Sequence, residues 1–127
     1  MIRALRPVRT PAWLLGSVLA GLIPAAASAH AIVLESSPPP GAVLARPPAQ
    51  ITLRFNSKIE KRFTRLTLAT GNQPPAPVTA ASDEPAAPDR LVIPIRSLAP
   101  GDYTLRYRVL AVDGHITEGA LRFTVEP

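Results

Sequence analysis

The chain contains two histidines, and the surroundings of each point to a metal ligand. His30 follows a run of small residues, and His115 ends the tripeptide Asp113-Gly114-His115. If His30 were a free N-terminus, its α-amine and its imidazole Nδ1 could bind one metal ion together. Such amines and imidazoles have ordinary pKa values of about 8 and about 6.5, so both lose their protons readily near neutral pH. Two nitrogens from one residue suit a tetragonal Cu(II) or Ni(II) centre, and the Irving–Williams order favours Cu(II).

Asp113 and His115 could complete such a site. They directly follow a predicted strand, and residues two apart in an extended chain point to the same side. With His30 they would provide three nitrogens and one oxygen for a single Cu(II) ion. A partner on the second ring nitrogen of His115 is expected to fix its tautomer. The alternative interpretation is an ordinary Asp-Gly turn followed by a solvated histidine.

The first segment of the chain has the three parts of a secretory signal peptide. Residues 1–11 carry three arginines and no acid, and residues 12–23 form an apolar run shorter than the roughly 20 residues that span a bilayer. The small residues that follow end in Ala27-Ser28-Ala29, an A-x-A cleavage site. We therefore expect residues 1–29 to be removed, which leaves His30 as the N-terminus of a domain over 30–127. Cleavage after Ala27, or an uncleaved anchor, would leave His30 without a free amine.

Cleavage changes the composition on which a functional interpretation rests. The 98 residues of the mature segment suit one small domain. Its formal net charge is +2 rather than +5, because three arginines leave and all nine acids remain, so the basic pI is weak support for nucleic-acid binding. The mature segment has no Cys, Met or Trp. It therefore has neither a disulfide framework nor a thiolate metal site.

The mature segment is predicted to be all-β. Residues 50–55, 103–109 and 121–125 alternate apolar and other residues with the period of a half-buried strand. Weaker candidates are 31–35, 63–69 and 91–95, and Pro94 indicates that the last is an edge strand or an interrupted one. Pro- and Gly-rich breakers separate these stretches, and no sustained helical period is present, so we expect a sandwich or barrel of about seven strands.

Two further expectations follow from the same pattern. Residues 71–90 are rich in Pro, Ala and Asp, and they are predicted to form a long, partly mobile loop. The aromatic side chains of the mature segment are expected to face mostly into the core. They are Phe55, Phe63, Tyr103, Tyr107 and Phe123.

The mature segment resembles the CopC copper-resistance proteins of the bacterial periplasm over essentially its whole length. Three stretches carry the resemblance: HAIVLESSPPPGAVLARPP at its start, ITLRF followed by NSKI, and LAPGDYTLRYRVLAVDGHITEGALRFTV at its end. The resemblance implies an immunoglobulin-like Greek-key sandwich or barrel. It also implies Cu(II) bound by the N-terminal histidine and by the aspartate and histidine of DGH, here His30, Asp113 and His115.

The sequence departs from the family pattern at several positions. Some members carry a methionine-rich segment for Cu(I), which this mature segment lacks, so no Cu(I) site is expected. Many members have a glutamate near the copper histidine where Ser57 stands here, and Glu60 lies close by in the sequence. Tyr107 and Ala111 replace a Trp and a Ser and are interpreted as changes in packing.

The leading functional hypothesis is a non-enzymatic, periplasmic Cu(II) carrier or buffer. It is expected to act as a monomer, to bind no nucleic acid, to leave the membrane after cleavage and to pass copper to an inner-membrane transporter of the CopD type. One alternative is a small copper oxygenase with an N-terminal histidine, although a carboxylate in the fourth equatorial position would leave no opening for oxygen. Another is a metal-free adhesion or assembly module, because a fold alone does not decide function.

Overall fold

The computed structural model describes residues 4–5, 7–8, 21, 31–81 and 87–127, so His30 and the predicted cleavage site lie outside the described residues. No helix within these ranges has the length and hydropathy to cross a membrane. The described chain forms eight strands and one short 3-10 helix. In chain order they are β1 (Val33–Ser37), β2 (Ala42–Leu44), β3 (Gln50–Phe55), η1 (Lys61–Phe63), β4 (Arg65–Thr70), β5 (Ala76–Val78), β6 (Arg90–Pro94), β7 (Gly101–Leu110) and β8 (Ile116–Val125).

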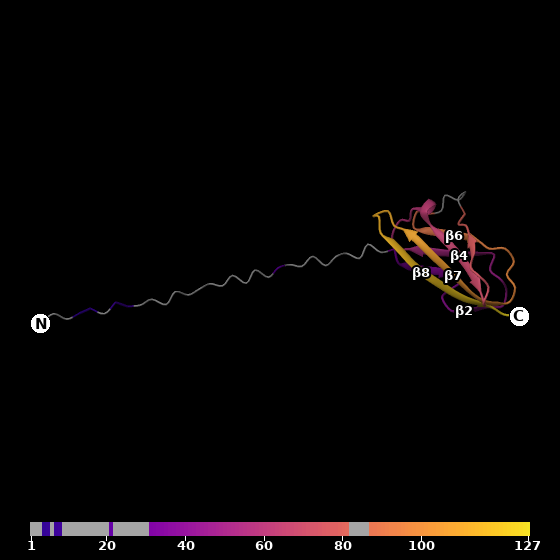
Figure 1. The fold of residues 1–127 in the computed structure, drawn as a ribbon, viewed down its shortest axis with the longest axis horizontal. Coiled ribbons are helices and arrows are strands. Elements are labelled where there is room, and N and C mark those ends of the chain that lie inside the picture. Colours follow the sequence, from indigo (N-terminus) through magenta and orange to yellow (C-terminus); the bar gives the residue numbers. More distant parts are fainter. Residues whose placement is uncertain (1–3, 6, 9–20, 22–30, 82–86) are drawn as a thin grey trace.

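The strands form two sheets, as Figure 1 shows. The smaller sheet has the antiparallel order β1-β3-β6, and the larger has the order β2-β8-β7-β4-β5. β2 runs parallel to β8, whereas the other pairs of the larger sheet are antiparallel. The predicted all-β sandwich is confirmed, with two separate sheets rather than one closed barrel.

The core lies between the two sheets and uses the alternating positions of the predicted strands. Ile51, Leu53 and Phe55 of β3 are at most 1% exposed, whereas Thr52 and Arg54 between them are only half-buried. From the larger sheet, Leu105 and Val109 are fully buried. The strongest strand predictions are confirmed, because each of these strands has one face against the core.

Aromatic side chains pack both between the sheets and within the larger sheet, and one of them departs from the expected position in the core. The Phe55 ring meets Tyr107 edge to face with centroids 5.8 Å apart, and Tyr103 stacks on Phe123 at 5.5 Å. Phe63 was expected to face the core from a strand over 63–69, but it belongs to η1 and is 53% exposed. β4 begins two residues later, at Arg65.

The long loop predicted over residues 71–90 is interrupted by a strand. Residues 76–78 form β5, which pairs with β4 from Leu66 to Leu68, and Val78 packs against the core. The expectation of one continuous loop was therefore wrong, and part of the segment, residues 82–86, lies outside the described residues. The edge position predicted from Pro94 is confirmed, since β6 is an outer strand of its sheet.

Gly119 gives the clearest prediction for stability. It lies opposite Tyr107, and a Cβ at this position would overlap the ring and hydroxyl of Tyr107, which packs against Phe55. Gly119→Ala should therefore lower the free energy of unfolding by about 1–3 kcal/mol, as overpacking commonly does. Urea denaturation measures this, with exposed Ala120→Ser as the neighbouring control, expected within about 0.5 kcal/mol of the parent. Equal stability of Gly119→Ala and the parent would contradict the prediction.

Candidate copper site

Asp113 and His115 lie in the tight turn between β7 and β8. The turn is closed by two backbone hydrogen bonds: the Ala111 N–H donates to the His115 carbonyl at 2.9 Å, and the Gly114 N–H donates to the Ala111 carbonyl at 2.9 Å. Gly114 has φ of +92°, a conformation that favours glycine. The glycine between the two candidate ligands is therefore required by the backbone of the turn.

The side chains of Asp113 and His115 contact each other, as their spacing predicted. Oδ1 of Asp113 accepts a hydrogen bond from the His115 backbone N–H at 3.0 Å and lies 3.2 Å from Nδ1 of the same residue. The backbone hydrogen bond is the main reason that the pKa of Asp113 lies below its usual value, and the imidazole adds to it. Asp113 is thus an anionic oxygen donor beside the ring.

The same contact fixes which ring nitrogen of His115 faces Asp113. That nitrogen is Nδ1, and because it lies 3.2 Å from Oδ1, one metal ion could bind both atoms. The partner expected on the other ring nitrogen, which would fix the tautomer, stays a prediction. The side chains of both residues reach solvent, with His115 57% and Asp113 35% exposed.

The chain next to His30 is anchored at the same end of the sandwich. Ala31 is fully buried, and the Ile32 N–H donates to Oδ1 of Asn56 at 2.8 Å. The backbone N–H of Asn56 donates in return to the Ile32 carbonyl at 2.9 Å. Asn56 therefore fixes the backbone two residues after His30 to the end of β3.

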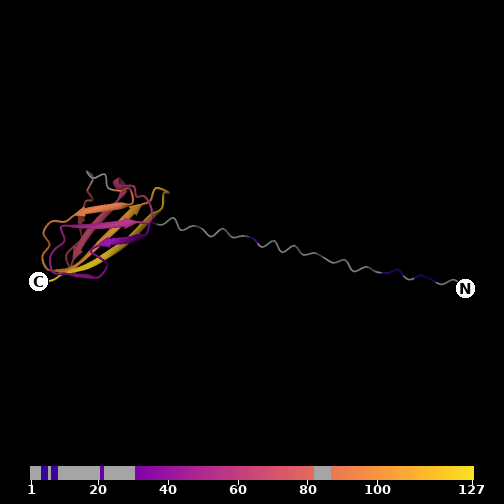
Figure 2. The ribbon, with the colours of Figure 1, turned by 180° about the vertical axis from the view of Figure 1, so that it is seen from behind.

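The segment after β3 continues from Asn56 to the β7–β8 turn. Ile59 forms an isolated bridge with Ala111, and the Val112 N–H donates to the Lys58 carbonyl at 3.1 Å. Residues 56–60 therefore contact the start of the domain on one side and the turn that carries Asp113 and His115 on the other. Figure 2 shows the two regions at the same end of the domain.

Asn56 is the site-forming residue that the sequence did not single out. The sequence pointed instead to Ser57 and Glu60. The Ser57 hydroxyl lies 3.4 Å from the Lys58 carbonyl, and the Glu60 backbone N–H donates to the Leu110 carbonyl. An asparagine directly after a strand is a known signal for side-chain bonding to a nearby backbone. Here the bond reaches 24 residues back along the chain, which that local signal does not reveal.

The described residues provide a pair of ligands rather than a complete site. Among them, no three His, Cys, Asp or Glu side chains lie close enough together to hold a metal ion. Asp113 and His115 can supply one oxygen and one nitrogen, and His30, the other candidate, lies outside the described residues. Any site that uses this pair therefore needs at least one further donor.

Comparisons with known proteins agree on the kind of protein. The CopC domain profile matches residues 33–126. "Copper resistance protein C" of Xanthomonas campestris pv. juglandis is 32% identical over 115 residues, which are 86% of this chain and 90% of that protein. The crystal structure of CopC from Methylosinus trichosporium OB3b is similar with a TM-score of 0.67 and 29% identity, covering 77% of this chain and 95% of that one.

Two other relatives differ from this chain, one in its methionine content and one in its length. PcoC from Escherichia coli, described as a methionine-rich copper resistance protein, has a TM-score of 0.61 and 30% identity, covering 76% of this chain and 99% of that one. "Copper transport protein CutJ" of Bacillus subtilis (strain 168) is 22% identical over 114 residues, which are 89% of this chain but 21% of that protein. The family match includes both sheets and the β7–β8 turn, and the chain belongs to the CopC family of copper-resistance proteins.

Proposed function

We propose that this chain is a periplasmic carrier or buffer of one Cu(II) ion, bound at the end of the sandwich where the mature chain begins. One observation carries the proposal: Asn56 anchors Ile32, and the segment after Asn56 contacts the turn that holds Asp113 and His115. Ala31, the residue after His30 in the sequence, is fully buried. We therefore assign the missing donors to His30.

The proposed ligands are the α-amine and Nδ1 of His30, Nδ1 of His115 and Oδ1 of Asp113. The last two atoms lie 3.2 Å apart, a separation at which one ion can bind both in place of the contact between them. Three nitrogens and one oxygen suit tetragonal Cu(II). The carboxylate in the fourth equatorial position also argues against an oxygen-activating enzyme, so we expect no turnover.

The proposed oxidation state follows from the side chains that the chain lacks. The chain has no Cys, and its single Met is Met1, which would leave with the signal peptide. Cu(I) prefers thiolate and thioether sulfur, so the mature protein would offer it no soft ligand. The contrast is with PcoC, which is described as methionine-rich.

Export and a membrane partner complete the proposal. Removal of residues 1–29 by a signal peptidase would both free the amine of His30 and release the domain into the periplasm. The match to about a fifth of the length of CutJ supports a link between this domain and copper transport. We propose that the chain acts as a monomer and hands copper to an inner-membrane transporter of the CopD type.

Titration of the mature protein with Cu(II), followed by electron paramagnetic resonance, tests the site. We expect one tetragonal, nitrogen-rich signal that saturates at one equivalent. His115→Ala or Asp113→Asn should lower the Cu(II) affinity by about 100-fold, because losing a ligand should cost at least as much as losing a partner that orients one. The matched control is Asp102→Asn, at the far end of β7, where the carboxylate accepts from the Thr124 hydroxyl at 2.7 Å. Equal loss in Asp113→Asn and Asp102→Asn would refute the assignment of Asp113.

A further inference from the structure

The outer surface of the larger sheet carries a row of arginines. Strand register places Arg65 of β4 directly opposite Arg108 of β7, and Arg106 and Arg122 project from the same side of β7 and β8. Their inward-facing neighbours Leu66, Leu105 and Leu121 are buried in the core. We call Arg65, Arg106, Arg108 and Arg122 the arginine face.

The charge on this face is largely uncompensated. Like charges directly opposite each other on a sheet destabilise it, and Arg65 and Arg108 are such a pair. Within the described chain, Glu118 is the acid that forms an ion pair with the face, through its Oε1 at 3.2 Å from Nε of Arg108. Both side chains of that ion pair are at least half exposed. A ligand that carries negative charge would neutralise this opposed pair.

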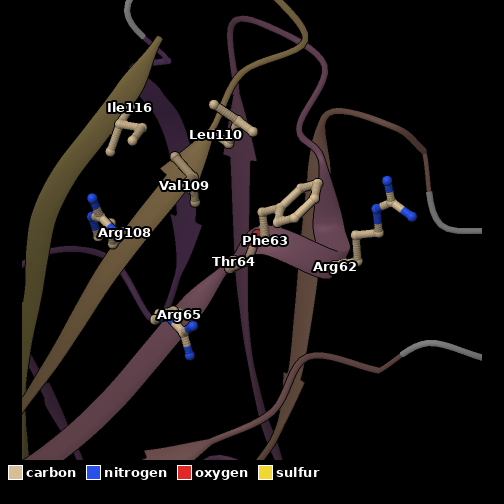
Figure 3. A pocket seen from close by; sticks show the side chains of 8 residues that line it. All are labelled: Arg62, Phe63, Thr64, Arg65, Arg108, Val109, Leu110 and Ile116. Carbon is tan, nitrogen blue, oxygen red and sulfur yellow. The ribbon is translucent and has the colours of Figure 1, made fainter. Parts of the chain in front are cut away.

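Two recesses lie among the arginines. One has a volume of about 230 Å³ and is lined by Arg62, Arg65 and Arg108 together with apolar side chains from η1, β7 and β8 (Figure 3). The other, of about 440 Å³, lies between Arg65, Arg106, Arg108 and Glu118. Side chains that carry carboxylates can enter such recesses and accept the paired hydrogen bonds of a guanidinium. A flat lipid surface would reach only the outermost atoms.

The first recess also has an apolar border. Phe63 and Ile116 are 53% and 50% exposed, and the guanidinium carbon of Arg62 lies 4.8 Å from the centre of the Phe63 ring. Exposed apolar side chains next to arginines are typical of protein interfaces, in which aromatic residues and arginine are enriched. The recess therefore fits a segment of polypeptide better than a free anion.

The arginine face begins where the candidate copper turn ends. Leu110 and Ile116, which are paired across β7 and β8, line the first recess and directly flank residues 111–115. We propose that the arginine face docks an acidic segment of the protein that exchanges copper with this chain. Opposite charges would steer the two together and set their orientation, with the acceptor next to Asp113 and His115. The role in copper exchange rests on the proposed function, whereas the docking itself does not.

A short capped peptide of alternating Glu and Ser, titrated into the ¹⁵N-labelled, copper-free mature protein at low ionic strength, tests the docking. We expect chemical-shift changes concentrated at Phe63, Arg65, Arg106, Arg108 and Ile116. The triple variant Arg65→Glu/Arg106→Glu/Arg108→Glu should weaken peptide binding by about 10-fold or more, and added salt should weaken binding to the parent. The neutral variant Arg65→Gln/Arg106→Gln/Arg108→Gln repeats the test if the first variant does not fold.

The matched control changes the same number of charges elsewhere. Arg46, Arg90 and Arg96 are exposed and lie outside the arginine face, so Arg46→Glu/Arg90→Glu/Arg96→Glu should retain most of the binding. Equal weakening by both triple variants would mean that only net charge matters, and it would overturn the proposal. Phosphatidylglycerol vesicles that bind through the same arginines while the peptide does not would overturn it in favour of a lipid surface.

Cu(II) affinity, measured in parallel, keeps this inference separate from the proposed function. The charge-reversed variant should bind Cu(II) as the parent does, since none of its changed residues is a proposed ligand. If the parent docks the peptide at the arginine face but binds no Cu(II), the docking stands and the proposed function fails. If the parent binds Cu(II) but the peptide causes no localised shifts, the docking proposal fails and the copper site stands.

Discussion

Acetylation of the α-amine of the mature protein is expected to weaken Cu(II) binding by about 1,000-fold, a loss of about 4 kcal/mol. With its α-amine, His30 binds copper through two nitrogens and closes a chelate ring. Acetylation converts the amine into an amide, whose lone pair is delocalised into the carbonyl and no longer binds the ion. Acetylation is a sharper change than an added residue, because an added residue would bring a new free amine of its own. Mass spectrometry of the N-terminal peptide would verify both the start at His30 and the site of modification.

The control for acetylation separates the two nitrogens of His30. A His30→Ala protein keeps a free α-amine and loses only the imidazole, so its affinity should also fall below that of the parent. Acetylating His30→Ala should then cost less than acetylating the parent, because no chelate ring remains to be broken. Equal Cu(II) affinity of the acetylated and unmodified parent would show that His30 is not the anchoring ligand.

The strands predicted most clearly from the sequence are those that have one face in the core. Gln50–Phe55 was predicted with the bounds that the structure has, because its alternate side chains are fully buried or partly exposed along its whole length. β2 and β5 were not predicted. Each has three residues, lies at an edge of the larger sheet and contains no fully buried residue, so neither shows an alternating pattern.

In the candidate site, too, the local features were predicted from the sequence and the long-range contacts were not. The spacing of Asp113 and His115, with Gly114 between them, predicted correctly that the two side chains come together. The spacing could not reveal that Asp113 faces Nδ1 of the imidazole, because that depends on how the β7–β8 turn closes. Asn56 was missed because its partner, Ile32, becomes a neighbour only when β1 pairs with β3. The sequence thus predicts which side chains can bind a metal ion, and the fold shows which contacts hold those side chains in place.

The Cu(II) affinity should fall steeply as the pH is lowered from 7 to 5. Protons compete with Cu(II) for nitrogen donors, so affinity falls as the pH drops below the pKa of each donor. With ordinary pKa values of about 8 for an α-amine and about 6.5 for an imidazole, the two nitrogens of His30 alone should reduce the affinity by about 1,000-fold between pH 7 and pH 5. Competition titrations with a chelator of known proton and copper affinities measure this fall.

Two variants assign the acid effect to particular groups. The pKa of Asp113 lies below its usual value, so its carboxylate stays ionised across this window, and Asp113→Asn should bind more weakly at both pH values but lose the same factor between them. The acetylated protein has no amine to protonate, so its affinity should fall less steeply. Unchanged steepness after acetylation would contradict a copper-bound amine even if the absolute affinity were lower. The slope of the pH dependence therefore tests His30 independently of the size of any single affinity.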